Sequence, residues 1–501
     1  MKLPKSFYSW TTITGAALAS ISLLLIIFMM LVSFIFGKGD NYTGLFTFII
    51  LPVFLIIGLI MIPLGAVRKI KEAKKLTDDE RKMNRFPVVD LNEPTQRKAV
   101  IIFATGSVIF LMLSAIGSYE AFHYSESVEF CGKLCHQVMK PEYVAYQHSA
   151  HARVSCVTCH VGPGAGWYVK SKMSGLYQVY AVTLGSYPKP IPTPISNLRP
   201  ARETCEQCHW PEKFYSRKLV SKRHYLADEA NTEWDINLNI KIGPSMQAHG
   251  LKEGIHWHIN PDVKIEYIST SVRRDTIPWV RYTNLKTNEV YVYEDSENPI
   301  GDIEKYKDQI RTMDCMDCHN RPSHHYRYPV HFVDEAITAG RISKELPEIK
   351  MLCMQILNEK FTTTDSAMAF IEKEILDFYS SGYPEIISDR KELVTNAIAA
   401  LQEEFQKNIF PEMGVIWDVY PSHLGHVETV GCDRCHNERH TTANNRVISR
   451  DCNLCHEITA QGPPDSIQMA TSFQGLEFRH PVDIGDEWKV TLCSECHKTL
   501  Y

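Results

Sequence analysis

The cysteines are the residues of this 501-residue chain with the clearest chemistry, because fourteen of the fifteen occur in pairs followed at once by histidine. Six pairs read C-x-x-C-H, and the first has one extra residue, C-x-x-x-C-H. C-x-x-C-H is the attachment signature of c-type haem, in which the following histidine binds the iron. The cysteine pairs are Cys131/Cys135, Cys156/Cys159, Cys205/Cys208, Cys315/Cys318, Cys432/Cys435, Cys452/Cys455 and Cys493/Cys496. Their histidines are His136, His160, His209, His319, His436, His456 and His497. The pattern therefore predicts seven c-type haems.

Zinc sites and disulfides also use paired cysteines. A zinc site needs two C-x-x-C units that close on one ion, and it does not require histidine after every second cysteine. A disulfide framework suits a small secreted scaffold and not a chain of this length. The unpaired Cys353 lies in an apolar stretch that predicts a helix, and we interpret it as a buried, inert thiol. Haem attachment is thus the preferred interpretation of the pairs.

The second axial ligand of each iron decides whether a haem transfers electrons or binds substrate. A second histidine closes the iron, methionine raises the potential, and an open position admits a substrate. Fourteen histidines lie outside the motifs, and roughly half should be ordinary side chains. Proximity to the motifs selects as candidate distal ligands Met139 for the first haem and His151, His258, His324, His426, His440 and His480 for the others, with His256 as an alternative to His258.

Three apolar stretches open the chain, and each meets the roughly 20 residues needed to cross a bilayer core. Lys2 and Lys5 precede the first stretch, and residues 68–98 carry ten Lys and Arg against six Asp and Glu. The excess of positive charge on cytoplasmic loops therefore predicts a cytoplasmic N-terminus and a cytoplasmic 68–98 loop, with everything after residue 118 in the periplasm. The three stretches cover about residues 10–36, 43–67 and 99–118.

The remainder divides by motif density and periodicity. Residues 221–310 lack a motif, and alternation at Val263, Ile265 and Tyr267 predicts strands, with a turn at 286–288. Apolar stripes between residues 332 and 410 predict helices, one of them capped by Thr364 or Asp365. The expected fold class is a multihaem cytochrome c: three transmembrane helices and a mainly α-helical and coil periplasmic haem domain with a small strand-rich insert. The expected regions are a membrane anchor (1–118), a trihaem segment (119–220), the insert (221–310) and a helical, tetrahaem region (311–501).

The charge is divided along the chain. Residues 1–118 hold 13 basic and 7 acidic residues, whereas residues 119–501 hold 40 basic and 51 acidic residues. An acidic outer domain suits docking of soluble redox partners with basic patches, although solubility alone explains the charge equally well.

Three stretches around the first motifs resemble the NapC/NirT family of membrane-bound multihaem quinol dehydrogenases. They read CGKLCHQVM (131–139), HARVSCVTCHVG (151–162) and LRPARETCEQCHWPEKF (198–214), and the resemblance is strongest over about residues 120–215. The whole chain is similar to the larger inner-membrane heptahaem cytochromes of metal-reducing bacteria. The resemblance implies that electrons pass from the quinone pool to periplasmic multihaem c-type cytochromes, in an anaerobic or extracellular respiratory chain.

The chain departs from this family at several points. The first family motif is C-x-x-C-H with methionine two residues beyond the histidine, whereas here Met139 stands three beyond His136. Family members typically have one span and four or five haems. A lysine after the second motif helps to form the quinol pocket in the family, which implies Lys170 or Lys172, with Gln178 downstream but no aspartate at the expected place. Alternatively, these lysines face lipid headgroups.

Taken together, these features predict an inner-membrane heptahaem cytochrome that oxidises menaquinol or a similar quinol, a quinol:cytochrome c oxidoreductase. His123, Lys170 and Lys172 are the candidate proton acceptors, and electrons would enter at the first haem and leave at the C-terminal three. The expected partners are the lipid bilayer, the quinone pool and periplasmic cytochromes, without nucleic acid and with homo-oligomerisation left open. Two alternatives remain: a terminal reductase of a small oxyanion such as nitrite, and a non-enzymatic electron-transfer subunit of a larger quinol-oxidising complex.

Overall fold

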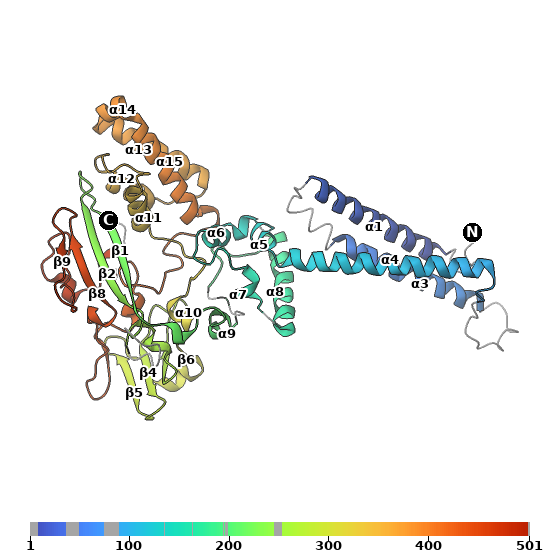
Figure 1. Cartoon of the computed structure of the whole chain (residues 1–501), viewed down its shortest axis with the longest axis horizontal. Coiled ribbons are helices and arrows are strands. Elements are labelled where there is room, and N and C mark those ends of the chain that lie inside the picture. Colours follow the sequence, from blue (N-terminus) through green and yellow to red (C-terminus); the bar gives the residue numbers. More distant parts are fainter. Residues whose placement is uncertain are drawn as a thin grey trace. The chain divides into compact units, whose positions relative to one another are not determined.

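The chain folds into two compact units, Met1–His136 and Gln137–Tyr501 (Figure 1). The expected boundaries at residues 118, 220 and 310 stay predictions about the organisation of the sequence. The computed structural model describes residues 9–36, 50–74, 90–134, 136–162, 164–193, 195, 199–244 and 253–498.

The smaller unit is built from long apolar helices, three of which are long and apolar enough to cross a membrane. The candidate spans are Trp10–Met29, Leu51–Lys69 and Gln96–Ser125. The third helix thus runs further than the expected 99–118, while residues 43–49 of the second stretch and the 37–42 loop lie outside the described residues. The helices of this unit are α1 (Trp10–Phe36), α3 (Leu51–Lys74), α4 (Pro94–Ser125) and α5 (Val128–Lys133).

Small residues let α1 and α3 pack side by side (Figure 1). A Cβ atom added at Gly15 would lie 2.8 Å from the carbonyl oxygen of Gly58, and one at Gly58 would lie 2.7 Å from the backbone nitrogen of Ala19. Close backbone approach at small residues is the usual way in which membrane helices associate, because lipid removes the hydrophobic drive between them.

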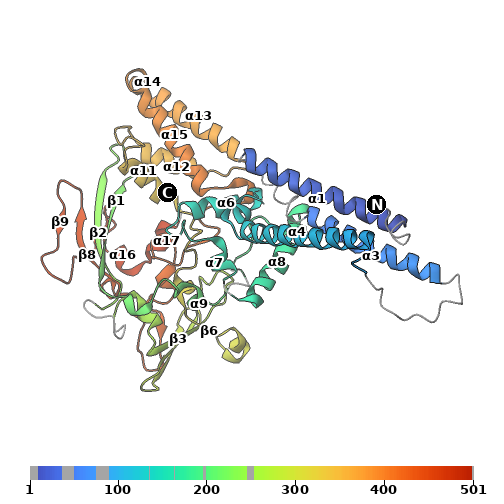
Figure 2. The same cartoon turned by 45° about the vertical axis from the view of Figure 1, so that its right-hand side comes forward.

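The strand-rich insert forms two antiparallel sheets, and both recruit strands from the C-terminal region (Figure 2). One sheet has the order β1-β2-β8-β9 and the other β6-β3-β4-β5-β7. In β3, Ile265 and Tyr267 are buried, but Glu266 and Ile268 are buried as well, so the burial of this strand does not alternate as predicted. Asn288 takes a positive φ in the β4–β5 turn. The strands are β1 (Arg217–Tyr225), β2 (Glu233–Lys241), β3 (Val263–Ile268), β4 (Trp279–Asn284), β5 (Val290–Asp295), β6 (Arg311–Thr312), β7 (His440–Thr441), β8 (His456–Gly462) and β9 (Gln468–Met469).

A helical subregion packs its apolar stripes into one core that includes Ile371, Ile375, Leu401 and Phe405, all fully buried. The helix predicted near residue 364 is present, but its cap is Thr363, whose side chain accepts from the backbone nitrogen of Ser366; neither Thr364 nor Asp365 is the cap. The helices of this subregion are α11 (Pro329–Thr338), α12 (Ile349–Asn358), α13 (Thr364–Gly382), α14 (Pro384–Asp389) and α15 (Lys391–Asn408).

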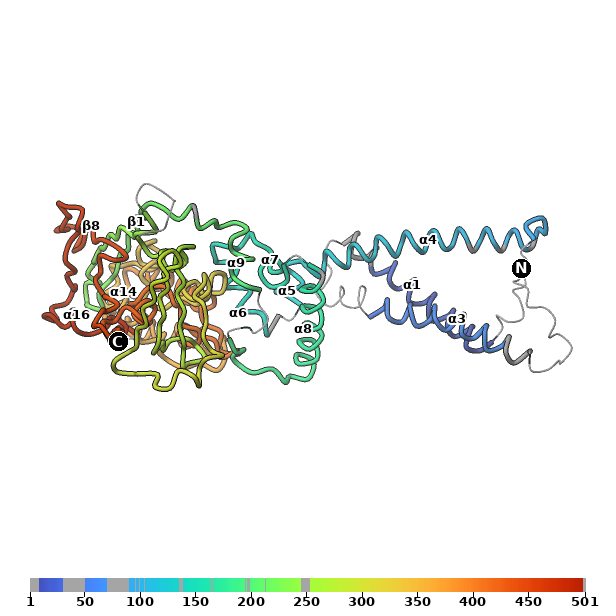
Figure 3. Tube along the Cα trace, turned by 90° about the horizontal axis from the view of Figure 1, so that it is seen from below, coloured from blue at the N-terminus to red at the C-terminus, as the bar shows by residue number. Residues whose placement is uncertain are grey.

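The motif regions consist of short helical pieces joined by coil (Figures 1 and 3). The α-helical pieces are α6 (His136–Gln147), α7 (Cys156–His160), α8 (Ala165–Thr183), α9 (Ala201–Cys205), α10 (Cys315–Cys318), α16 (Glu487–Val490) and α17 (Cys493–His497). The 3-10 turns are η3 (Pro211–Lys213), η4 (Ile255–Ile259), η5 (Ile303–Gln309), η6 (Pro411–Met413), η7 (Gly431–Arg434) and η8 (Cys452–Leu454).

Candidate haem centres

Most of the Cys pairs lie on a single helical turn. α7, α10 and α17 each begin at the first cysteine of a motif, and η7 and η8 cover the corresponding part of two others. On a helical turn, residues three apart face the same side. The local backbone therefore presents both thiols to one side, which is the arrangement that attachment to a single flat group requires.

The motif cysteines are not enclosed to the same degree, although the sequence pattern treats them as equivalent. Cys496 is exposed, as are Cys208, Cys432 and Cys452, whereas Cys493 on the same helix as Cys496 is half-buried. Haem attachment through Cys496 stays a prediction.

The motifs of the larger unit are neighbours in chain order. The thiols of Cys205 and Cys315 share a hydrogen bond, which brings the third and fourth motifs together. The other neighbouring motifs are linked by cysteines close enough to interact electrostatically. These cysteine pairs are Cys159–Cys208, Cys318–Cys432, Cys432–Cys455 and Cys452–Cys493. Groups attached at these motifs would form one continuous series from the second to the seventh.

Each motif histidine of the larger unit faces one histidine from outside the motifs. The ring centres of the six pairs lie between 5.8 and 6.3 Å apart. None of these six joins two motif histidines or two others. The pairs are His209–His151, His160–His324, His319–His256, His436–His258, His456–His426 and His497–His480.

This spacing fits a shared metal ion better than it fits ring packing. Metal–imidazole bonds of about 2 Å on opposite sides of one ion place the ring centres about 6 Å apart, since each centre lies about 1 Å behind its nitrogen. Aromatic packing alone allows centre distances of about 4.5–7 Å and favours particular ring orientations. Here the distance is nearly constant while the interplanar angle runs from 7° to 83°. A ligand axis predicts this combination, because each ring can rotate about its own bond to the ion.

Most of the distal histidines also have a hydrogen-bond partner for one ring nitrogen, Nδ1. The Nδ1–H groups of His256 and His258 donate to the carbonyls of Ile242 and Ile255, each at 3.0 Å. His151 and His324 likewise direct Nδ1 at a backbone carbonyl, whereas Nδ1 of His480 lies near both the carbonyl (2.8 Å) and the backbone nitrogen (3.2 Å) of Val482 and is left out of this argument. A carbonyl only accepts, so Nδ1 carries the proton and Nε2 is left as the free ligand atom, which is the usual support of a metal-bound histidine.

The insert positions two of these ligands through the turn η4, which directly precedes β3. Gly254 starts the turn with φ 86°, and a Cβ atom there would lie 2.6 Å from the carbonyl oxygen of Lys241. Only glycine fits this close approach at a positive φ. His256 and His258 are two residues apart on the turn, and their rings reach different motif histidines.

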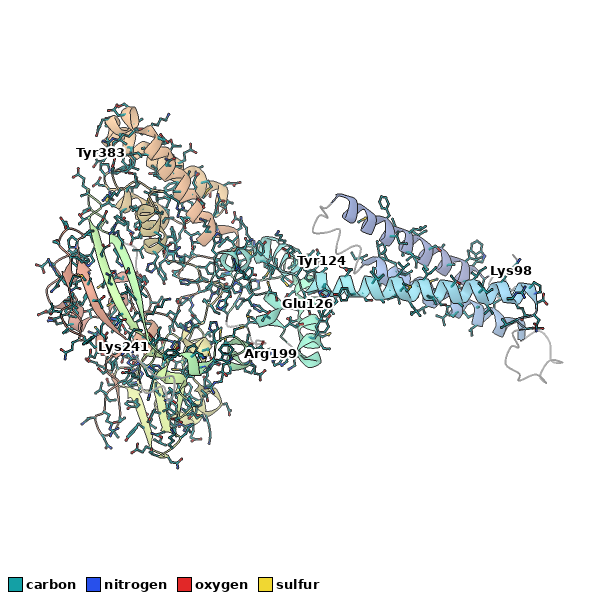
Figure 4. All side chains as sticks on the ribbon, in the orientation of Figure 1. Lys98, Tyr124, Glu126, Arg199, Lys241 and Tyr383 are labelled. Atoms are coloured by element: carbon teal, nitrogen blue, oxygen red, sulfur yellow. The ribbon has the colours of Figure 1, made fainter. Side chains whose placement is uncertain are left out.

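The end of β2 anchors the sixth motif. Lys241, labelled in Figure 4, donates from its backbone nitrogen to the carbonyl of Cys455 at 2.8 Å. Its Nζ lies 2.5 Å from the carbonyl of Asn453 and 3.0 Å from the carboxylate of Glu457. β8 then pairs with β2, with His456 opposite Ile240. The insert therefore holds a motif that lies more than two hundred residues further along the chain.

The structure pairs His151, His258, His324, His426 and His480 with motif histidines, and it pairs His256 as well, which the sequence offered only as an alternative to His258. His440 lies outside these six pairs. It is fully buried, and its ring makes hydrogen bonds to Asn437 (2.9 Å) and to the carbonyl of Ile277 (2.7 Å). Both ring nitrogens are thus engaged, while His258 occupies the position opposite His436. The role of His440 as a ligand stays a prediction.

The first motif is described only in part. Cys131 lies on α5, but Cys135 and the side chain of His136 are outside the described residues. Met139 lies on α6 and is half-buried. Its role as a ligand stays a prediction.

The candidate quinol-site residues lie on two helices. His123 is exposed near the end of α4, with its ring centre 4.3 Å from that of Tyr119. On α8, the Nζ atoms of Lys170 and Lys172 lie 4.6 and 4.9 Å from the ring centres of Trp167 and Tyr168. Gln178 is exposed on the same helix. His123, Lys170 and Gln178 are exposed and Lys172 is half-buried, and their role in a quinol site stays a prediction.

A buried polar group without a partner supports the presence of a further charged group beside the second motif. Nε and Nη1 of Arg199 are buried and have no hydrogen-bond partner among the described residues. A Cβ atom at Gly162, just beyond His160, would lie 2.0 Å from this Nη1. Unpaired buried guanidinium nitrogens are costly, so an acidic group is expected here, and a haem propionate has the required charge. Among the described residues, no group of three or more His, Cys, Asp and Glu could hold a metal ion.

Paired cysteines on helical turns and opposed histidines define a multihaem c-type cytochrome. The family model for the N-terminal region of the NapC/NirT cytochrome c family matches residues 93–190, and the chain belongs to this family. The cytochrome c-type protein ImcH of Geobacter sulfurreducens is 43% identical over 493 residues, which cover 98% of this chain and 95% of ImcH. The cytochrome c-type protein NrfH of Wolinella succinogenes is 32% identical over 114 residues, 22% of this chain and 63% of NrfH. No solved structure matches the chain.

Proposed function

We propose that this chain is a heptahaem inner-membrane cytochrome that oxidises menaquinol or a similar quinol and passes the electrons to periplasmic multihaem cytochromes. Six of the haems would each be held by one of the six histidine pairs, and the first by His136 with Met139. When bound, the haems accept and pass on single electrons. The observation that carries the proposal is the series of neighbouring motifs, each with its opposed histidines.

The entry point is assigned from the smaller unit. The candidate span Gln96–Ser125 ends a few residues before Cys131, and the ring of Tyr124 lies 5.5 Å from that of Phe130 on α5. The first motif is therefore held beside the end of a span, where a lipid-soluble quinol is available. The N-terminus and the 68–98 loop would be cytoplasmic, and the larger unit periplasmic, because of the positive charge of that loop.

Quinol oxidation also releases two protons, which need acceptors. His123 has two ring nitrogens and suits a general base, whereas the ammonium groups of Lys170 and Lys172 suit donation to a quinol oxygen. At each of the six described motif histidines, the opposed histidine would fill the second axial position of the iron. A substrate could then not bind that iron, which counts against a terminal oxyanion reductase at these six positions. Each quinol-site candidate can be tested separately.

The test is haem reduction by a menaquinol analogue, followed by absorbance, with the full chain in liposomes. Replacing His123, Lys170 or Lys172 by Gln is expected to slow reduction by about 10–100-fold if the residue assists proton transfer or binding. The matched control is Lys373→Gln, an exposed lysine on α13. If quinol never reduces the haems, while dithionite does, the proposal fails and the chain is an electron-transfer subunit only. A high-spin signal from motifs two to seven would favour the reductase.

A further inference from the structure

α8 presents its large apolar side chains outward. Leu176, Tyr177 and Tyr180 are 65%, 67% and 59% exposed. The opposite face turns inward, since Val182 packs against a core cluster of the larger unit. The spacing of three, four and seven residues places the exposed side chains on one stripe of the helix. This apolar stripe consists of Val169, Met173, Leu176, Tyr177, Tyr180 and Leu184.

α13, a helix of the same unit, has the opposite arrangement of apolar and charged side chains. On α13, Ile371 and Ile375 are fully buried, while Lys373 points outward with its side chain 66% exposed. A helix that faces water hides its apolar stripe in this way. α8 does not hide its apolar stripe in this way. It lies at the edge of the unit in the views of Figures 1 and 3. A contiguous exposed apolar stripe marks a surface that is covered by something other than water.

The charges of α8 identify what covers it. Its only charged side chains are Lys170 and Lys172, and it has no acidic residue, whereas residues 119–501 as a whole are acidic, with 51 acidic and 40 basic residues. Both lysines lie over aromatic rings, those of Trp167 and Tyr168. An apolar stripe, aromatic rings and basic side chains without acidic ones are the composition of a helix that lies in a membrane interface. Phospholipid phosphates complement this charge.

We propose that α8 lies in the interfacial layer of the bilayer, with its apolar stripe among the acyl chains and Lys170 and Lys172 at the level of the phosphates. The bilayer is available because the same chain carries three candidate spans. The larger unit would then have a lipid attachment of its own in addition to those spans. This inference goes beyond the proposed function, since lipid contact of α8 does not require quinol to bind.

The test uses the full-length holoprotein in liposomes of phosphatidylethanolamine and phosphatidylglycerol with isotope-labelled acyl chains. A benzoylphenylalanine residue is placed at Tyr177, at Met173 or, as the control, at Lys373. After illumination, labelled lipid attached to the protein is measured by mass spectrometry. We expect positions 177 and 173 to give at least about tenfold more lipid adduct than position 373, because only the stripe reaches the acyl chains.

Two results would overturn the proposal. Cross-links from positions 173 and 177 to protein, whether to a second copy, another segment of this chain or another protein, would show that a protein surface covers the stripe. Yields of lipid adduct equal to that at position 373 would show that α8 faces water. Haem absorbance of each variant verifies that it is folded, and two independent positions on the stripe guard against failure of one variant. Haem reduction by quinol, measured on the same liposomes, separates failure here from failure of the proposed function.

Discussion

Nη2 of Arg434 donates to the backbone carbonyl of Asp317 at 2.7 Å. Arg434 lies between Cys432 and Cys435, and Asp317 lies between Cys315 and Cys318. The contact thus joins the fourth and fifth motifs through the residues that separate their cysteines. The same guanidinium also donates to the carbonyls of Gly431 and Arg274, at 2.7 and 2.8 Å.

Asp317 is itself the centre of a buried network. Its carboxylate accepts from Tyr267 (2.6 Å), Arg274 (2.7 Å) and Arg311 (2.9 Å), and its side chain is 1% exposed. The network ties the β3–β4–β5 sheet to the fourth motif, while Arg434 extends it to the fifth. Arg434 therefore helps to fix the relative position of these two motifs, together with His423, whose Nδ1 lies 3.0 Å from the same Asp317 carbonyl.

Replacement of Arg434 by Gln is expected to lower the free energy of unfolding by about 3–5 kcal/mol, because three carbonyls lose a charged donor. Denaturant unfolding followed by Trp fluorescence measures the change. Arg390→Gln is the matched control, since Arg390 pairs with Glu345 at 3.0 Å where both side chains are exposed, and such pairs contribute less than about 1 kcal/mol. Equal effects of the two substitutions would contradict a stabilising role of the hydrogen bonds made by Arg434.

The ligand of the fifth haem can be decided by comparing two histidines. His258→Ala removes the ring opposite His436 and is expected to convert one haem to a high-spin form, visible by electron paramagnetic resonance. His440→Ala removes a buried ring that hydrogen-bonds Asn437 and the carbonyl of Ile277, and it should leave every haem low-spin. The reverse result would support the sequence-based prediction for His440 and refute the pairing with His258.

A buried ion pair in the helical core predicts a pH dependence. Nζ of Lys350 lies 2.6 Å from Asp334, with the two side chains 0% and 4% exposed. Burial lowers the pKa of Lys350 below its usual 10.5. Between the lowered value and 10.5, the unfolded chain binds more protons than the folded one, so stability rises with pH through this window. Lys350→Met should abolish that part of the rise, which denaturant unfolding at several pH values would measure.

A single and a double variant of Lys350 and Asp334 distinguish the effect of removing one partner from the effect of removing both. Lys350→Met leaves the buried Asp334 with a 3.2 Å contact to Nδ1 of His224 in place of its ammonium partner. This loss is expected to cost about 3–5 kcal/mol, whereas the double variant Lys350→Met, Asp334→Leu should unfold within about 1–2 kcal/mol of the original chain. A double variant as unstable as the single one would show that the ion pair has a further structural role.

Counting thiols tests the number of haems. Cys353 is fully buried, and burial raises the pKa of its thiol to about 12, so a thiol reagent should not reach it in the folded protein. If all fourteen motif cysteines form thioethers, the native protein shows no reactive thiol and the denatured protein shows one. The sensitive positions are the exposed ones, because a thiol there would react in the native protein if it carried no haem; they are Cys208, Cys432, Cys452 and Cys496. The Cys353→Ala variant should show no thiol in either state, and the intact mass would give the number of haems attached.

The features that depend only on short stretches of sequence were the most predictable. The apolar spans and the helical stripes need only local composition and periodicity, and the structure has helices in these places. The pairing of strands was not predictable in this way. β8 joins β2, and β7 joins β5, across long separations, and nothing in the insert alone indicates these partners.

The distal histidines show the same limit. His151, His324 and His426 stand near a motif in sequence, yet His324 faces His160 and not the adjacent His319. His256 and His258 are neighbours on one turn and serve two different motifs, which no spacing rule would suggest. Tertiary contacts between distant segments decide which ring meets which motif, so sequence identified candidates but not their partners.

The histidine pairs also imply an order of assembly. In five of the six pairs, the distal histidine precedes its motif in the chain, as His256 precedes His319. Because the chain is made from its N-terminus, both ligands of these five centres are present once the motif itself has been exported. His160 is the exception, since its partner His324 comes later. The second centre should therefore stay incomplete until the fourth motif has been exported, and a chain truncated before His324 should hold a five-coordinate haem at His160.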